Sequence, residues 1–135
     1  MAGVLSFKGD PLWKRADDPG YRVGWRSKAR FEKGHLDGEM TYEFLVRSNP
    51  DEEQASMALI GRRNFGDPQS GLKYEQWNNT GTYGATLFGV ADYDYGVAND
   101  PGVITHLVFV ASTESGTTDL YVNGAYQGSV EAAIT

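Results

Sequence analysis

Apolar and polar residues alternate along several short segments of this 135-residue chain. In residues 40–47, MTYEFLVR, the apolar side chains Tyr42, Phe44 and Val46 occupy every second position. Successive side chains of a β-strand point to opposite faces, so this pattern predicts a strand with one buried face and one solvated face. The turn-forming residues 48–51, SNPD, then end the strand.

The same reasoning predicts further strands, separated by segments rich in turn-forming residues. They cover residues 2–7, 21–25, 29–32, 55–60, 72–77, 83–90, 106–111, 120–122 and 126–130. Residues 72–77 alternate, whereas HLVFVA at 106–111 is nearly all apolar and is predicted to be buried on both faces. Residues 91–102, rich in Asp, Tyr and Gly, are predicted to form a loop. For residues 52–59, one or two turns of helix are the alternative prediction.

The segment TDLYVNGAYQGSV at 118–130 predicts a β-hairpin. Asn123 and Gly124 stand between its two apolar runs, and both residue types tolerate the positive φ angles of a type I′ turn. With roughly nine or ten closely spaced strands, the chain is predicted to be one all-β domain over residues 1–135. Residues 1–20 form its N-terminal arm and first strand. The 17 glycines suit many tight turns, and the absence of cysteine excludes disulfides.

Charge is distributed unevenly along the chain. All 12 Lys and Arg residues lie at or before Lys73, so residues 74–135 carry seven acidic groups and no basic one. A basic cluster, Arg22, Arg26, Lys28, Arg30 and Lys33, lies near the N-terminus. Because the chain is acidic overall and has no nucleic-acid-binding motif, we expect no nucleic-acid partner. No apolar stretch approaches membrane-spanning length, so no membrane insertion is expected.

Three of the predicted strand regions carry family-like motifs. MTYEFLVR at 40–47 is similar to a strand "F-T-hydrophobic-E-hydrophobic-W-V", and MALIGRR at 57–63 to "hydrophobic-I-x-K/R". Residues 104–130 are similar to the pattern W-H-H-V-A-V-T-x-D-G-x-x-x-L-Y-V-N-G, with His106 at its second His and with Ile104 and Thr105 as departures. These motifs resemble the concanavalin A-like jelly-roll superfamily, and within it the laminin-G-like, pentraxin-like modules of bacterial surface proteins and glycan-degrading enzymes.

The resemblance implies a jelly-roll β-sandwich of two antiparallel sheets. In the family further strands follow the hairpin, and the shortened C-terminus predicts a sheet edge that lacks them. An open edge attracts another strand, so we expect completion by a second copy, as a homodimer, or by another segment of a parent protein. The alternative is that residues 2–7 or 130–135 close the sheet internally.

Catalysis is not predicted. Glycosidases of this superfamily pair carboxylates in E-x-D-x-E or E-x-D-x-x-E arrangements, and no Glu-x-Asp sequence occurs here. Glu39 and Glu43 share a strand face but stand roughly 13 Å apart, too far for a retaining pair. His35 and His106 are the two histidines, and neither has a motif that predicts a triad or a zinc site.

Two kinds of ligand site are predicted in the C-terminal half. Aromatic rings stack on the apolar faces of sugars while amides and carboxylates hydrogen-bond the hydroxyls. We expect such a sugar-binding site at the loop rim of the sandwich. Its candidate residues are Trp77, Asn79, Tyr83, Asp92, Tyr93 and Asp94. Related sandwiches often hold calcium with hard oxygen ligands, and the candidates here are Asp92, Asp94 and Asp100.

The sequence therefore predicts a non-catalytic module that binds a carbohydrate or another surface ligand. The alternative is a structural or assembly module that works through protein–protein contacts at an open sheet edge. An exported parent protein would place either module outside the cell or at its surface.

Overall fold

A computed structural model describes residues 38–50, 57–62, 69–76 and 80–135, all within a compact unit that spans His35–Thr135. The predicted strands at 2–7, 21–25 and 29–32, and the predicted N-terminal arm, lie outside the described residues. Within the described ranges no helix has the length and apolar character needed to cross a membrane.

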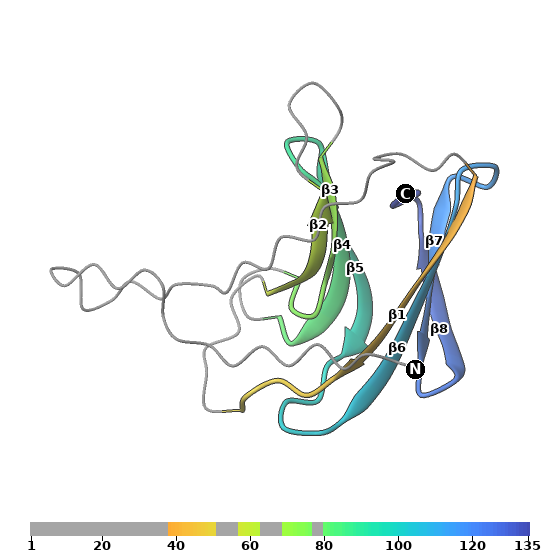
Figure 1. Cartoon of the computed structure of the whole chain (residues 1–135). Helices are drawn as coiled ribbons and strands as arrows, with labels where there is room; N and C mark the ends of the chain where they lie inside the picture. Colours follow the sequence, from red (N-terminus) through yellow and green to blue (C-terminus); the bar gives the residue numbers. More distant parts are fainter. Residues whose placement is uncertain (1–37, 51–56, 63–68, 77–79) are drawn as a thin grey trace, which may run out of the picture. The chain divides into compact units, whose positions relative to one another are not determined.

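The strands form two antiparallel sheets of four strands each (Figure 1). One sheet, called here the hairpin sheet, contains in spatial order β1 (Glu39–Val46), β6 (Thr105–Ser112), β7 (Thr117–Val122) and β8 (Ala125–Val130). The other, the meander sheet, contains β2 (Ala58–Arg62), β3 (Ser70–Lys73), β4 (Thr82–Leu87) and β5 (Ala91–Ala98). The described part of the chain is thus all-β, with two antiparallel sheets arranged as a β-sandwich, which confirms the predicted all-β sandwich.

The apolar faces of the two sheets share one core. Its buried members are Leu72, Tyr74, Tyr83, Ala85, Leu107, Phe109, Leu120, Val130, Ala132 and Ile134. The Phe109 ring of the hairpin sheet lies 6.0 Å from the ring of Tyr95 of the meander sheet, measured between centroids. The Tyr95 hydroxyl also donates to the backbone oxygen of Thr118 at 2.9 Å. One tyrosine therefore joins the sheets both by packing and by a hydrogen bond.

The hairpin between β7 and β8 has the predicted turn. Asn123 has φ of 51° and Gly124 has φ of 82°, the two positive values that a type I′ turn requires. The register pairs Val122 with Ala125 and Tyr121 with Tyr126 before it shifts by a bulge. The turn thereby determines which side chains lie opposite each other across the hairpin.

The segment after β8 returns to the core instead of pairing as a strand. Ala132 and Ile134 are buried, and Figure 1 shows the C-terminal end lying between the two sheets. The buried Thr118 hydroxyl donates to the Ala132 oxygen at 2.6 Å and accepts from the Ile134 amide at 3.0 Å. Residues 131–135 therefore cover the core without forming a strand that pairs with the sheet edge.

Two predictions about single strands were wrong. Residues 91–98 form β5, although we predicted a loop for 91–102. Tyr93, Tyr95 and Val97 point inward while the positions between them are exposed, so the Asp residues occupy the solvated face of a strand. Strand β6 alternates between buried and partly exposed positions and is therefore not buried on both faces as predicted.

The predicted alternation at 72–77 is also wrong, because every residue from Leu72 to Gln76 is buried. Lys73 and Glu75 occupy positions that the alternation placed on the face opposite Leu72, Tyr74 and Gln76, yet both are buried. Lys73 Nζ donates to the backbone oxygen of Gln76 at 3.2 Å, and the Glu75 carboxylate accepts three hydrogen bonds described below, which is how buried polar side chains are usually stabilised.

Two core tyrosines predict how stability responds to alkaline pH. Burial raises the pKa of Tyr83 to about 12 and raises the pKa of Tyr95 above its usual value. Tyrosines of the unfolded chain ionise near pH 10, so stability is unaffected below that pH and falls as the pH rises from about 10 towards 12. We expect phenolate absorbance to rise in two stages, the second together with the loss of near-ultraviolet circular dichroism. Tyr83→Phe should diminish the second stage; an unchanged second stage would contradict the assignment.

Candidate functional site

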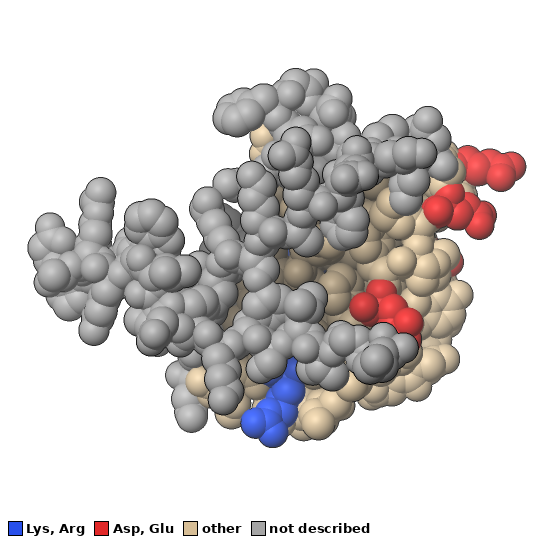
Figure 2. Space-filling view, in the orientation of Figure 1, with Lys and Arg blue, Asp and Glu red and all other residues tan. Residues whose placement is uncertain are grey.

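An open hollow lies on the outer face of the hairpin sheet. It has a volume of about 440 Å³ and is lined by Glu39, Val110, Ser112, Glu114, Ser115, Thr117 and Asp119. Strand register explains the grouping, since Val110 lies opposite Asp119, and Ser112 lies opposite both Glu39 and Thr117. Figure 2 shows acidic side chains at the edge where Figure 1 places the start of β1 and the turn between β6 and β7.

Two tyrosines lie beside the hollow on the same outer face of the hairpin sheet. Tyr121 and Tyr126 are cross-strand partners, and their ring centroids are 5.4 Å apart at an interplanar angle of 60°. Tyr126 is 57% exposed. Asp119 and Tyr121 are two residues apart on β7, so their side chains emerge on the same face about 7 Å from each other. An aromatic surface therefore adjoins the carboxylates and hydroxyls of the hollow.

His106 and Glu43 form a polar pair further along this face. His106 Nε2 lies 2.7 Å from Glu43 Oε1, and the backbone N–H of His106 donates to Asn123 Oδ1 at 3.0 Å. The imidazole thus links β6 to β1, while the backbone anchors the hairpin turn. Both contacts give His106 a structural role, since one joins two strands and the other holds the hairpin turn.

The aromatic residues predicted for a sugar site are placed differently from that prediction. Trp77 and Asn79 lie outside the described residues. Tyr83 is 1% exposed and packs edge-to-face against Tyr74, with ring centroids 5.5 Å apart. Tyr93 is partly buried and packs against the core. Tyr83 therefore belongs to the interior, where its ring offers no open face to a sugar, and Tyr93 packs against the core with part of its side chain exposed.

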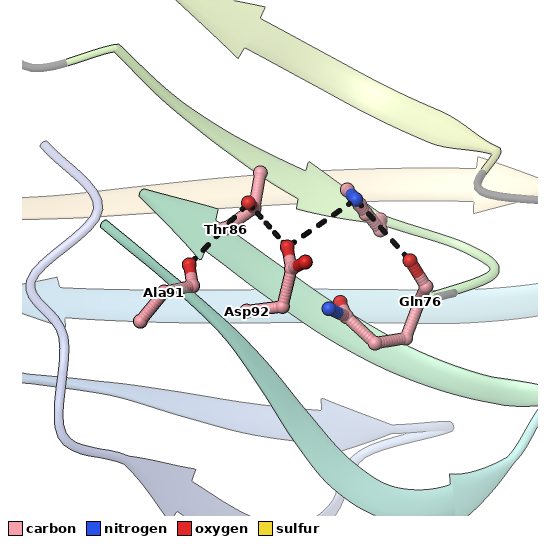
Figure 3. Close-up of polar contacts among 5 residues, drawn as sticks. Gln76, Thr86, Ala91 and Asp92 are labelled. Atoms are coloured by element: carbon pink, nitrogen blue, oxygen red, sulfur yellow. Dashed lines mark hydrogen bonds and ion pairs between the residues drawn. The ribbon is translucent and has the colours of Figure 1, made fainter. Parts of the chain in front are cut away.

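Asp92 and Asp94 do share the outer face of the meander sheet. The Thr86 hydroxyl donates to Asp92 Oδ1, and Lys73 Nζ lies 3.6 Å from the same oxygen (Figure 3). The hydrogen bond from Thr86, aided by the Lys73 charge, lowers the pKa of Asp92 below its usual value. Asp94 accepts from the Thr82 hydroxyl at 2.9 Å and from the Gly96 amide at 2.7 Å.

The three candidate calcium ligands are not brought together. Asp92 and Asp94 bind the partners just given, and Asp100 lies beyond the end of β5. Within the described part of the chain, no three His, Cys, Asp or Glu side chains are grouped so that they could hold a metal ion. The nearby Asn99 donates from its Nδ2 to Tyr74 O at 2.9 Å and to Glu75 Oε2 at 3.1 Å.

The hairpin-sheet residues were missed as site residues although a signal for them was present. The Asn-Gly turn was recognised, and a two-residue turn places Tyr121 opposite Tyr126 by register alone. Alternation on β7 then puts Asp119 on the same face as Tyr121. What the sequence could not show is that β1 lies beside β6 and brings Glu39 to the same end of the sheet.

The fold and its surfaces define a β-sandwich with polar groups on both outer faces. Comparison of the chain with protein-family models, with curated proteins and with solved structures found no match.

Proposed function

We propose that this β-sandwich is a non-catalytic carbohydrate-binding module of the laminin-G-like, jelly-roll type. The observation that carries the proposal is the hollow of the hairpin sheet, with the Tyr121–Tyr126 pair beside it. Tyrosine rings offer the flat apolar surface on which a sugar ring stacks. The carboxylates of Glu39 and Asp119 accept hydrogen bonds from sugar hydroxyls, and the Ser and Thr hydroxyls both donate and accept.

The charge of the hollow restricts the ligand class. Glu39, Glu114 and Asp119 contribute three carboxylates, and none of the described residues that line the hollow is basic. Like charges repel at this range, so sialylated and sulfated glycans are disfavoured. Neutral glycans and glycans with amino sugars fit the site.

A glycan array, probed with and without calcium, tests the proposal. We expect retention of neutral or amino-sugar glycans, and a loss of affinity of about tenfold or more for Tyr126→Ala because the stacking surface is removed. Asp119→Asn should also weaken binding. Asp94→Asn, on the other sheet, is the matched control and should bind like the wild type. Retention of no glycan, or equal binding by wild type and Tyr126→Ala, would contradict the proposal.

One observation favours the assembly module as the second candidate. Leu45 is 74% exposed and Ile104 is 63% exposed, and strand register places both at the same end of the hairpin sheet. Exposed apolar side chains that lie together favour contact with another protein surface. Sedimentation should then show a concentration-dependent dimer that Leu45→Ser weakens. A strict monomer at high concentration would exclude self-association as the function.

A further inference from the structure

The hollow of the hairpin sheet holds negative charge that none of the described side chains around it offsets. Its carboxylates belong to Glu39, Glu114 and Asp119, and the four strands of this sheet contain no Lys or Arg. Within the described part of the chain, none of these three carboxylates takes part in a hydrogen bond or an ion pair. Glu43 on the same face and Asp94 on the other sheet, by contrast, each have a partner. The hollow therefore gathers carboxylates that are available to a ligand.

Strand register sets the distances between the groups that face such a ligand. Glu39 and Thr117 lie in one row, on the two strands that flank β6, and are roughly 10 Å apart. Asp119 lies one row further along β7, and the Tyr121–Tyr126 pair lies one row beyond it, roughly 14 Å from the first row. These distances exceed the size of a single sugar ring. A ligand that reaches both the carboxylates and the tyrosine rings is therefore an oligosaccharide that runs along β7.

The tyrosine pair attracts cations as well as apolar surfaces. The face of an aromatic ring is negative, so it attracts a cation within about 6 Å of its centre. Asp119 and Tyr121 emerge on the same face about 7 Å from each other. A positive charge between them is attracted by both, whereas a neutral hydroxyl at the same place gains only a hydrogen bond.

The hydroxyl groups of the hollow favour a cationic sugar over a basic peptide. The hydroxyls of Ser115 and Thr117 lie 2.7 Å apart, and Ser112 contributes a third. A hydroxyl both donates and accepts, as the hydroxyls of a sugar do, whereas the side chains of Lys and Arg only donate. The hydroxyls and the stacking surface thus match a sugar, and the carboxylates match a positive charge on it.

We propose that the preferred ligand of the hollow is an oligosaccharide of amino sugars whose amines are free and protonated. The proposal rests on the carbohydrate-binding function proposed above and specifies the substrate class of that same site. The rings of the sugar stack on Tyr121 and Tyr126, and its amines pair with the carboxylates of the hollow. A single exposed ion pair contributes little, so several amines along one oligosaccharide are needed for a clear preference.

Three tetramers with the same β-1,4-linked backbone test the proposal, because they differ only in the group at C2. Glucosamine tetramer has an amine there, its fully N-acetylated form has an acetamide, and cellotetraose has a hydroxyl. Calorimetric titration of the full chain is made at about pH 6, where the carboxylates are ionised and the amines are protonated. We expect glucosamine tetramer to bind about tenfold more tightly than the other two at low salt. In about 1 M salt the Debye length falls to about 3 Å, and the three affinities should differ by about twofold or less.

Two variants test whether the carboxylates of the hollow cause this preference. Asp119→Asn and Glu39→Gln retain the size of each side chain and remove its charge. Each should lower the ratio of the affinity for glucosamine tetramer to that for cellotetraose by about threefold. Asp94→Asn, on the other sheet, is the matched control and should leave the ratio unchanged.

The outcomes separate this proposal from the function on which it rests. Equal binding of the three tetramers, or a preference that neither salt nor the two variants reduce, overturns the amino-sugar proposal and leaves carbohydrate binding standing. Binding of no tetramer overturns both. Tetralysine serves as the probe for a basic peptide, and binding of tetralysine as tightly as glucosamine tetramer also overturns the amino-sugar proposal.

Discussion

Replacing Phe109 with alanine is expected to lower the free energy of unfolding by about 3–5 kcal/mol. Phe109 is fully buried, and its ring packs against Phe44 at 6.2 Å on its own sheet and Tyr95 at 6.0 Å on the other, measured between centroids. Truncation leaves a cavity where the two sheets meet. The variant therefore loses both the free energy gained by removing the ring from water and the contacts that the ring makes in the core. Urea unfolding, monitored by circular dichroism, measures the effect as a lower urea concentration at the midpoint of unfolding.

Val108→Ala is the matched control for this experiment. Val108 is the neighbouring residue, but it lies partly exposed on the outer face of β6. Its truncation should cost about 1 kcal/mol or less because little buried surface is lost. Similar losses for the two variants would mean that β6 is buried on both faces, contrary to the structure.

Replacing Glu75 with alanine is expected to cost about 3 kcal/mol or more, since three donors lose their acceptor. The fully buried Glu75 carboxylate accepts from the Thr80 hydroxyl at 3.1 Å, from the Gly81 amide at 2.9 Å and from Asn99 Nδ2 at 3.1 Å. These bonds join the end of β3 to the turn before β4 and to the segment after β5. Thermal or urea unfolding measures the loss.

Two controls separate the hydrogen bonds of Glu75 from a general effect of removing a carboxylate. Glu75→Gln retains one carbonyl acceptor and should lose distinctly less stability than Glu75→Ala. Glu114→Ala removes a carboxylate from the exposed turn after β6 and should change stability by about 0.5 kcal/mol or less. If Glu75→Ala matched Glu114→Ala, the three hydrogen bonds would not be stabilising the meander sheet.

The β-sandwich could be predicted because its strongest signals are local. The alternation of Tyr42, Phe44 and Val46 and the Asn123-Gly124 turn each depend on a few neighbouring residues, and the structure confirms both. β5 was missed because Asp92 and Asp94 have low strand propensity, and propensity was given more weight than the inward Tyr93 and Tyr95. Tertiary burial of these tyrosines outweighs the preference of aspartate for loops.

The candidate sites were harder to predict, since a residue type does not reveal which face it occupies. Tyr83 was a reasonable stacking residue until the structure placed its ring in the core. The hollow requires β1 to lie beside β6, a pairing between distant parts of the chain that no local pattern encodes.

The pairing of β1 with β6 has a consequence for how the chain folds. Val46 pairs with Thr105 and Glu39 with Ser112, which are separations of 59 and 73 residues in sequence. Such distant contacts close large loops and slow the search for the native state, typically to milliseconds or seconds. During synthesis β1 leaves the ribosome well before β6 exists, and until then its apolar side chains lack their partner strand. While β1 is unpaired during synthesis, the nascent protein is therefore prone to aggregation.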